Sequence, residues 1–307
     1  MKFAILGSGA VGGYYGAKLA RAGHDVTFVA RGAHLEAIRA RGLEIRSAVL
    51  GDFTVHAPAE EDTARVGPVD VVVFAVKMYD ADVAAAALAA LVGPQTVVVP
   101  FQNGVESVDI LSRHVPVANV AGGVAYITAV ITEPGVIRHT VMDQLIFGEL
   151  RGGRSTRLER LLDVCLRAGF QARLSEDVNI DIWSKFVRLT VFSGMTSVTR
   201  SSIGVVRSDP DLQAMAEMGW REGLEVARAC GVALPSSTLD EIHTMWTSMS
   251  PQAKSSMLED LERGHRLELP WLSGAIVRLG EARGVPTPVH RFIATVLRPH
   301  VDGHRRQ

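Results

Sequence analysis

The chain has 307 residues, which is enough for two domains and more than one ordinary hydrophobic core holds. Hydrophobic residues make up 47% and charged residues 21%, the balance of a soluble globular protein. The formal net charge of -1 and the pI of about 6.8 give no reason to expect nucleic acid or a membrane surface as a partner. The basic end, residues 304–307, is too short to alter that expectation.

Segments that would point to secretion, membrane insertion or metal binding are not evident. Apolar stretches such as residues 69–76 are far shorter than the roughly 18 residues that a membrane span needs. The N-terminus passes directly into a predicted strand, without the layout of a signal peptide. Cys165 and Cys230 stand in apolar helical patterns, so we expect two buried thiols in a reducing cytoplasm. The ten histidines are scattered, and we expect no metal site.

The first half of the chain alternates between short apolar runs and helical patterns. Buried strands are expected at residues 3–6, 26–30, 69–75 and 96–99, with shorter strands at 43–46 and 53–56. Helices are expected up to about residue 22 and at 34–41 and 80–91. This alternation predicts an α/β fold with a Rossmann-type, doubly wound parallel sheet. A helix at 155–168 and a strand at 170–173 would complete this NADP-binding domain, residues 1–174.

The second half is almost wholly helical in pattern. Helices are expected at 178–193, 209–230, 238–247, 252–263, 270–283 and 288–298. We therefore expect an all-helical C-terminal domain, residues 175–307, to carry the substrate and the catalytic groups. The apolar helices at 209–230 and 270–298 would bury either against a second copy, in a homodimer, or only against each other.

A glycine motif follows the first predicted strand. It has the form G-x-G-x-x-G and consists of Gly7, Ser8, Gly9, Ala10, Val11 and Gly12. The first glycine permits a tight turn, the second lets a pyrophosphate approach, and the third lets helix and strand pack closely. The N-terminus of the following helix presents N–H groups to the phosphates. Because the motif lies inside a complete βαβ unit, it predicts a dinucleotide site.

The end of the second predicted strand indicates which dinucleotide binds. NAD-binding units place an acid there, about 20 residues past the glycines, to accept a bond from the ribose 2′-hydroxyl. This chain has Arg31 instead, and Asp25 begins the strand, out of reach. An arginine at this point would contact a 2′-phosphate, so we expect NADP. The alternative is an exposed arginine at a strand end.

Two polar residues follow predicted strands where an open α/β sheet binds its ligands. Asn103 is short and precedes a glycine, so it could bond a nicotinamide carboxamide or a substrate carbonyl. Asn-Gly is also a common turn. Lys77 follows residues 69–76, and the alternative there is a solvated surface charge.

Candidate proton donors and anchors stand in the helical half. Lys185 enters an apolar helix two residues after Trp183, and burial would lower its pKa enough to let it donate a proton near neutrality. On one continuous helix, Ser256 and Glu268 would be about three and a third turns apart and within roughly 120° of the same face. Buried ion pairs and solvated faces are the commoner explanations for such residues.

The motifs of the chain form an ordered set. The glycine motif is followed by Val76-Lys77, Gln102-Asn103-Gly104, Trp183 to Lys185, Ser-Ser-Met-Leu-x-Asp at 255–260, and Glu268 to Gly274. The ordered set resembles the ketopantoate reductase (2-dehydropantoate 2-reductase) family along essentially the whole chain. The resemblance implies NADPH-dependent reduction of the ketone of 2-dehydropantoate to pantoate, a step toward pantothenate and coenzyme A. It places Lys77 at the cofactor and Arg31 on the 2′-phosphate.

The resemblance also implies roles in the substrate site. Lys185 would protonate the ketone oxygen as hydride arrives at carbon 2, and Glu268 would bond the substrate hydroxyl and help to place that lysine. Ser256 would bind the substrate carboxylate, and Asn103 would lie in the cleft near the nicotinamide.

The substrate-binding positions depart from the family pattern. The best-characterised members carry asparagines four and eight residues after the lysine, where this chain has Leu189 and Ser193. The usual Asp two residues past the acid is Pro270, and the Asn three residues later is Ser273. A pocket with these residues has fewer hydrogen-bond donors, so an alternative substrate is a more apolar 2-oxo acid or ketone.

An alternative of another class is a non-catalytic NADP-binding protein, against which the retained lysine and acid argue. Other two-domain dehydrogenases fit less well. A 6-phosphogluconate dehydrogenase would need a further anion-binding cluster for its substrate phosphate. A 3-hydroxyacyl dehydrogenase would prefer NAD and use a His-Glu pair, for which no suitable histidine stands in the expected segment.

Overall fold

The structure is a computed structural model that describes residues 1–303, and the basic end at 304–307 lies outside the described residues. The described chain divides into two compact units. The first comprises Met1–Gln102 and Glu106–Asp181. The second comprises Asn103–Val105 and the described residues from Ile182 onward. Three residues that follow a strand of the first unit thus belong to the second.

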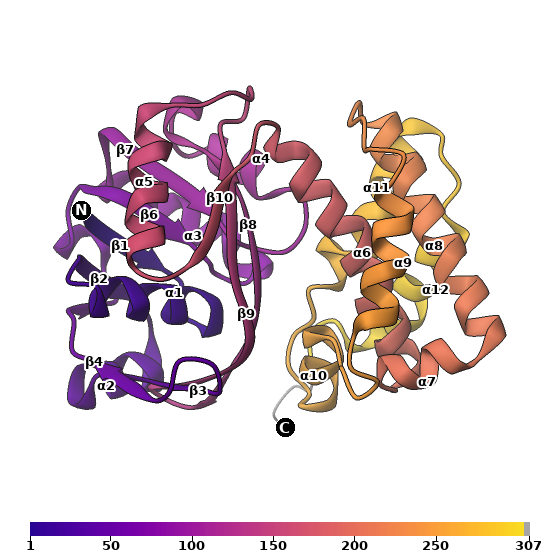
Figure 1. The fold of residues 1–307 in the computed structure, drawn as a ribbon, viewed down its shortest axis with the longest axis horizontal. Coiled ribbons are helices and arrows are strands. Elements are labelled where there is room, and N and C mark those ends of the chain that lie inside the picture. The colour runs from indigo at the N-terminus through magenta and orange to yellow at the C-terminus, as the bar shows by residue number, and fades with distance from the viewer. Residues whose placement is uncertain (304–307) are drawn as a thin grey trace. The chain divides into compact units, whose positions relative to one another are not determined.

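The first unit is built on a five-stranded parallel sheet in the order β5-β2-β1-β6-β7 (Figure 1). Its strands are β1 (Lys2–Leu6), β2 (Asp25–Val29), β5 (Ala59–Glu60), β6 (Val69–Phe74) and β7 (Val92–Pro100). The central strands are buried on both faces, which is why they appear in the sequence as continuous apolar runs. The chain order reverses on the two sides of β1, so the switch point lies between β1 and β6. The predicted Rossmann-type sheet is confirmed.

A second sheet completes the first unit. It has the order β10-β9-β3-β4, with β8 paired to β9. Its strands are β3 (Leu43–Ser47), β4 (Phe53–Val55), β8 (Gly122–Glu133), β9 (Val136–Gly148) and β10 (Gln171–Leu174). The short strands expected at 43–46 and 53–56 therefore form, but they pair antiparallel in this sheet and not in the parallel one. The long β8–β9 hairpin was not predicted, although residues 124–131 of β8 are rich in strand-forming side chains.

The helices of the first unit are α1 (Ala10–Arg21), α2 (Gly32–Arg41), α3 (Ala81–Ala86), α4 (Ser107–Ser112) and α5 (Thr156–Arg167), with short 3-10 turns η1 (Thr63–Arg65), η2 (Met78–Asp80), η3 (Ala87–Ala90) and η4 (Val117–Asn119). Helix α1 contacts strands of both sheets and is buried along most of its length. The single helix expected over 80–91 is divided among η2, α3 and η3.

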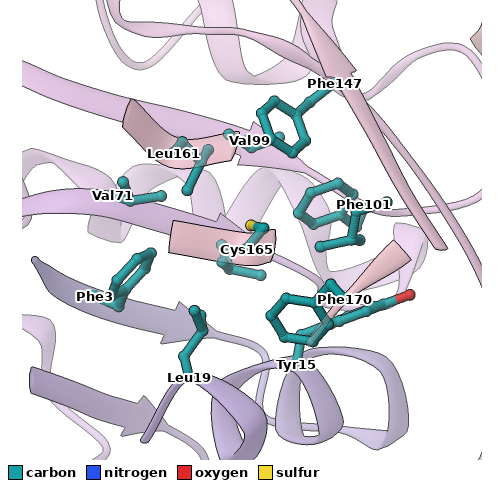
Figure 2. A pocket seen from close by; sticks show the side chains of 12 residues that line it. Phe3, Tyr15, Leu19, Val71, Val99, Phe101, Phe147, Leu161, Cys165 and Phe170 are labelled. Carbon is teal, nitrogen blue, oxygen red and sulfur yellow. The ribbon is translucent and has the colours of Figure 1, made fainter. Parts of the chain in front are cut away.

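The main core of the first unit surrounds a narrow cavity (Figure 2). Aromatic and aliphatic side chains line it, among them Phe3, Phe101 and Phe170, together with Cys165. Burial raises the pKa of the Cys165 thiol to about 12, so the thiol is inert. The expectation of two buried thiols is met at Cys165, whereas Cys230 is only partly buried.

The described part of the second unit contains helices and no strand, as predicted. Its elements are α6 (Val178–Thr199), α7 (Ile203–Ser208), α8 (Pro210–Ala229), α9 (Thr238–Ser248), α10 (Ser256–Glu262), α11 (Ser273–Arg283) and α12 (Pro288–Leu297), with η5 (Leu269–Trp271) and η6 (Arg298–His300). Helix α6 begins in the first unit and runs past the predicted end at 193, and α7 was not predicted. Among the described residues, no helix has the length and apolar character that crossing a membrane would require.

Candidate active site

The glycine loop lies at the carboxyl end of β1, next to the switch point. Gly7 has a φ of +96°, and a Cβ there would come within 2.5 Å of the Val76 backbone nitrogen. A Cβ on Gly12 would lie 2.3 Å from the Gly7 carbonyl oxygen. Gly9 differs, because a Cβ there would meet nothing within 4 Å. The fold itself therefore requires the first and third glycines, while the second keeps open the space that an approaching pyrophosphate needs.

The first turn of α1 is suited to an anion. Gly9 is its N-cap and supplies no side-chain cap, and the turn holds no acidic residue. Ala10 and Val11 begin the helix, so their backbone N–H groups belong to the unsatisfied end. The Ser8 hydroxyl lies 3.0 Å from the Ile5 carbonyl oxygen, so its side chain turns inward and holds the loop. These residues fit a dinucleotide pyrophosphate bound through the backbone.

Arg31 stands where β2 ends and α2 begins. Its side chain is 74% exposed and forms an ion pair with the carboxylate of Asp80, the last residue of η2. The sequence places no acid at the end of β2, yet the fold brings one there from the loop after β6. Asp80 could not be found from spacing, because it lies 49 residues from its partner.

The loops after β6 and β7 are tied to each other. Lys77 is partly buried and precedes η2, and its carbonyl oxygen accepts a bond from the Asp80 N–H at 2.9 Å. Gln102 donates from Nε2 to the Val76 carbonyl oxygen at 2.8 Å. Its other amide atom, Oε1, is buried and has no hydrogen-bond partner among residues 1–303. Gln102 therefore offers an acceptor at the strand exits, a feature that its place in the motif alone did not reveal.

His34, which the sequence did not single out, supports the glycine loop. It lies in the first turn of α2, with Nε2 2.9 Å from the Ser8 carbonyl oxygen. Its Nδ1 accepts a bond from the Gly135 N–H at 3.0 Å. Burial lowers the pKa of His34, against the opposing effect of the Ser8 bond. The ring is thus neutral with its proton on Nε2, and it joins the loop to the β8–β9 turn.

Lys185, Asn103 and Glu268 come together in the second unit. The Lys185 ammonium donates to Asn103 Oδ1 at 3.0 Å. The pKa of Lys185 is lowered to about 7, chiefly by burial and in addition by the positive charge of Arg188, while the negative charge of Glu268 opposes both. The Glu268 side chain is only 6% exposed. The structure therefore joins one lysine with an amide and an acid from distant parts of the chain.

The segment that carries Glu268 is fixed by a buried polar network. Glu268 precedes η5, which contains Pro270, and Ser273 opens α11. The Ser273 hydroxyl lies 3.2 Å from Nδ1 of His290, whose Nε2 lies 3.0 Å from the Gly219 carbonyl oxygen. Burial lowers the pKa of His290 to about 4, so the ring is neutral and donates only from Nε2. Ser273 is thus engaged with His290 in packing α11.

The position of Ser256 differs from the expectation of one continuous helix with Glu268. Helix α10 ends at Glu262, before Glu268, so that arrangement is wrong. Ser255 is the buried N-cap of α10 and lies 2.8 Å from the Thr196 hydroxyl on α6. Ser256 is exposed, and no hydrogen bond within the described residues joins it to Lys185, Asn103 or Glu268.

Leu189 and Ser193 follow Lys185 on α6 at one and two turns. Leu189 is partly buried and packs against the core of the second unit. Ser193 is fully buried, and its hydroxyl has no hydrogen-bond partner within the described part of the chain. Among the same residues, no group of three or more His, Cys, Asp or Glu side chains is placed to hold a metal ion.

Known proteins resemble this chain in sequence and in structure. Residues 3–152 match the family described as ketopantoate reductase PanE/ApbA, and residues 177–301 match ketopantoate reductase PanE/ApbA C terminal. A 2-dehydropantoate 2-reductase from Mesorhizobium japonicum is 33% identical, with 97% of each chain covered. The crystal structure of a PanE/ApbA family ketopantoate reductase from Ralstonia eutropha shares 34% identity over 98% of each chain, with a TM-score of 0.90. D-mandelate dehydrogenase with NADH and anilino(oxo)acetate has a TM-score of 0.91 at 22% identity over 98% of each chain, a likeness of fold.

A Rossmann-type sheet with an open glycine loop, together with a lysine beside an acid, is typical of oxidoreductases that use a nicotinamide cofactor. The sequence matches are more specific, and the chain belongs to the ketopantoate reductase family. It is accordingly an oxidoreductase that acts on CH–OH or C=O groups. The resemblance indicated by the sequence motifs is confirmed.

Proposed function

We propose that this protein reduces the ketone of 2-dehydropantoate to pantoate with NADPH, a step toward pantothenate and coenzyme A. The observation that carries the proposal is the partly buried Lys185, held by Asn103 and near the charge of Glu268, with its pKa lowered to about 7. A proton donor for a carbonyl works best when its pKa lies close to the working pH. The retained site thus supports catalysis over a non-catalytic, NADP-binding role.

The cofactor would be held by the first unit. The backbone of the glycine loop would receive the pyrophosphate, Arg31 would contact the 2′-phosphate, and Lys77 would lie at the bound dinucleotide. The exposure of Arg31 leaves its guanidinium accessible to an anion. When bound, NADPH supplies a hydride to the carbonyl carbon of the substrate.

The second unit would handle the proton and the substrate. Lys185 would give its proton to the ketone oxygen and regain one from solvent. Asn103 accepts a hydrogen bond from the ammonium and so directs it, while the Glu268 carboxylate favours the charged form. Glu268 would also bond the substrate hydroxyl, and Ser256 would bind the substrate carboxylate.

A second candidate substrate is a more apolar 2-oxo acid or ketone. The observations that favour it lie on α6, where Leu189 presents an aliphatic side chain one turn from Lys185. Ser193 offers a single buried hydroxyl, which could donate to only one substrate oxygen. Location in the cytoplasm and assembly as a homodimer stay predictions from the sequence.

Initial rates of NADPH oxidation test the proposal. We expect turnover of 2-dehydropantoate above that of branched and aromatic 2-oxo acids. Lys185→Ala should lose most of the rate yet bind NADPH with unchanged affinity in a fluorescence titration. The matched control is Lys254→Ala, which removes an exposed lysine paired with Glu262 at 2.7 Å and should retain full activity. Turnover of another oxo acid but not of 2-dehydropantoate would reject 2-dehydropantoate as the substrate. NADPH binding without turnover of any oxo acid would reject a catalytic role.

A further inference from the structure

The ion pair at the end of β2 bears on the choice between NADP and NAD. The Asp80 carboxylate pairs with the Arg31 guanidinium, the group expected to receive a 2′-phosphate. Asp80 also precedes α3, where an aspartate commonly caps the helix through its side chain. Here it makes no side-chain cap bond. The carboxylate thus reaches across to β2 and does not satisfy the helix next to it in sequence.

The backbone around Asp80 holds it at this point. Its N–H donates to the Lys77 carbonyl oxygen at 2.9 Å, which closes the η2 turn. Met78, in the same turn, is buried at 2% exposure and anchors it to the core. Asp80 is 28% exposed, against 74% for Arg31. The acid is therefore the more buried member of the pair, and the arginine is the more exposed one.

A bound 2′-phosphate would meet both members of this pair. It carries up to two negative charges, so it is attracted by the guanidinium and repelled by the carboxylate. It must also compete with Asp80 for the donors of Arg31. A ribose with a free 2′-hydroxyl has no such conflict, because the hydroxyl can donate to a carboxylate, as in NAD-binding sites.

We propose that Asp80 is a cofactor-selectivity residue, which limits the preference for NADPH over NADH by pairing with Arg31 and by offering an acceptor to the ribose 2′-hydroxyl. The inference rests on the cofactor site of the proposed function. NAD-binding units carry an acid at the end of the second strand, which this chain lacks. In this inference Asp80, from the loop after β6, takes the place of that acid.

Direct binding tests the inference without turnover. NADPH and NADH are titrated into the full-length protein, and nicotinamide fluorescence gives the two dissociation constants. In Asp80→Asn, we expect NADPH to bind about tenfold more tightly and NADH no more tightly, so that the ratio of the two constants rises about tenfold or more. The matched control is Asp82→Asn, two residues on, because Asp82 is 69% exposed and pairs with Arg113 and His114. Its ratio should equal that of the wild type.

Each result is decisive. An unchanged ratio in Asp80→Asn, or weaker binding of NADPH, would overturn the inference, since weaker binding would mean that Asp80 serves to position Arg31 for the phosphate. If Asp80→Asn does not fold, Asp80→Ser carries the same expectation. Failure of the wild type to bind either nucleotide would reject the proposed cofactor site itself. Binding of NADPH with no effect of Asp80 would leave that site intact and reject only the selectivity role.

Discussion

Replacement of Lys185 by methionine should abolish activity and stabilise the fold in acid. Burial disfavours the ammonium form of Lys185 and lowers its pKa from 10.5 to about 7. Between these two pH values, the unfolded chain holds a proton on this lysine that the folded chain has largely released. Stability therefore rises with pH across this window, and the full penalty applies below pH 7. Methionine has a similar length and no charge, so Lys185→Met removes the penalty.

The magnitude follows from the lowered pKa. A fall from 10.5 to about 7 corresponds to about 5 kcal/mol of destabilisation at pH values below 7. The substitution also removes the bond to Asn103, which contributes about 1 kcal/mol. The attraction between the ammonium and Glu268 is already contained in the lowered pKa, so its loss adds no further cost. We therefore expect Lys185→Met to exceed the wild type by about 4 kcal/mol at pH 6 and to have no advantage at pH 10.

Denaturant unfolding at a series of pH values measures this difference. The quantity to compare is the free energy of unfolding of the variant minus that of the wild type, with Lys254→Met as the control at an exposed lysine. The control should show no trend with pH. A difference for Lys185→Met that stays constant from pH 6 to pH 10, or grows with pH, would show that Lys185 is solvated and would remove the basis for its role as a proton donor.

Two other substitutions separate binding, chemistry and folding. Gly9→Ala should leave the thermal midpoint of unfolding unchanged, because its Cβ meets nothing within 4 Å, and should weaken NADPH binding at least about tenfold by filling the space for the pyrophosphate. Gly12→Ala should lower the thermal midpoint, because its Cβ would lie 2.3 Å from a carbonyl oxygen. Equal effects of the two substitutions would contradict the interpretation of the loop. Arg188→Gln removes a charge that lowers the pKa of Lys185, so the pH at which kcat for reduction falls should move upward, whereas an unmoved pH profile would mean that Lys185 is not the titrating acid.

The features that the sequence predicted well are those with short-range causes. The strands of the parallel sheet are buried on both faces, so their apolar runs are visible without knowledge of the fold. Gly7 is required by its positive φ and Gly12 by the nearby Gly7 carbonyl oxygen, which gives the loop its recognisable spacing. Lys185 could be singled out because it stands among the apolar residues Trp183, Phe186 and Val187 of its helix.

The features that the sequence could not predict depend on contacts between distant segments. Asp80 reaches Arg31 only because β6 and β2 lie on either side of β1. Nothing in the local pattern of His34 shows that its two ring nitrogens will bridge the glycine loop and a turn a hundred residues later.

The Asn-Gly pair at 103 and 104 shows why a turn and a functional residue need not be alternatives. Gly104 has a φ of +95°, a conformation that a side chain disfavours, and its Cα lies so near Trp271 that a Cβ would come within 3.0 Å of the Trp271 carbonyl oxygen. That turn gives Asn103–Val105 to the second unit. Only because the glycine turns the chain there can Asn103 accept the bond from Lys185. The common turn is therefore the means by which a strand exit supplies an amide to the lysine.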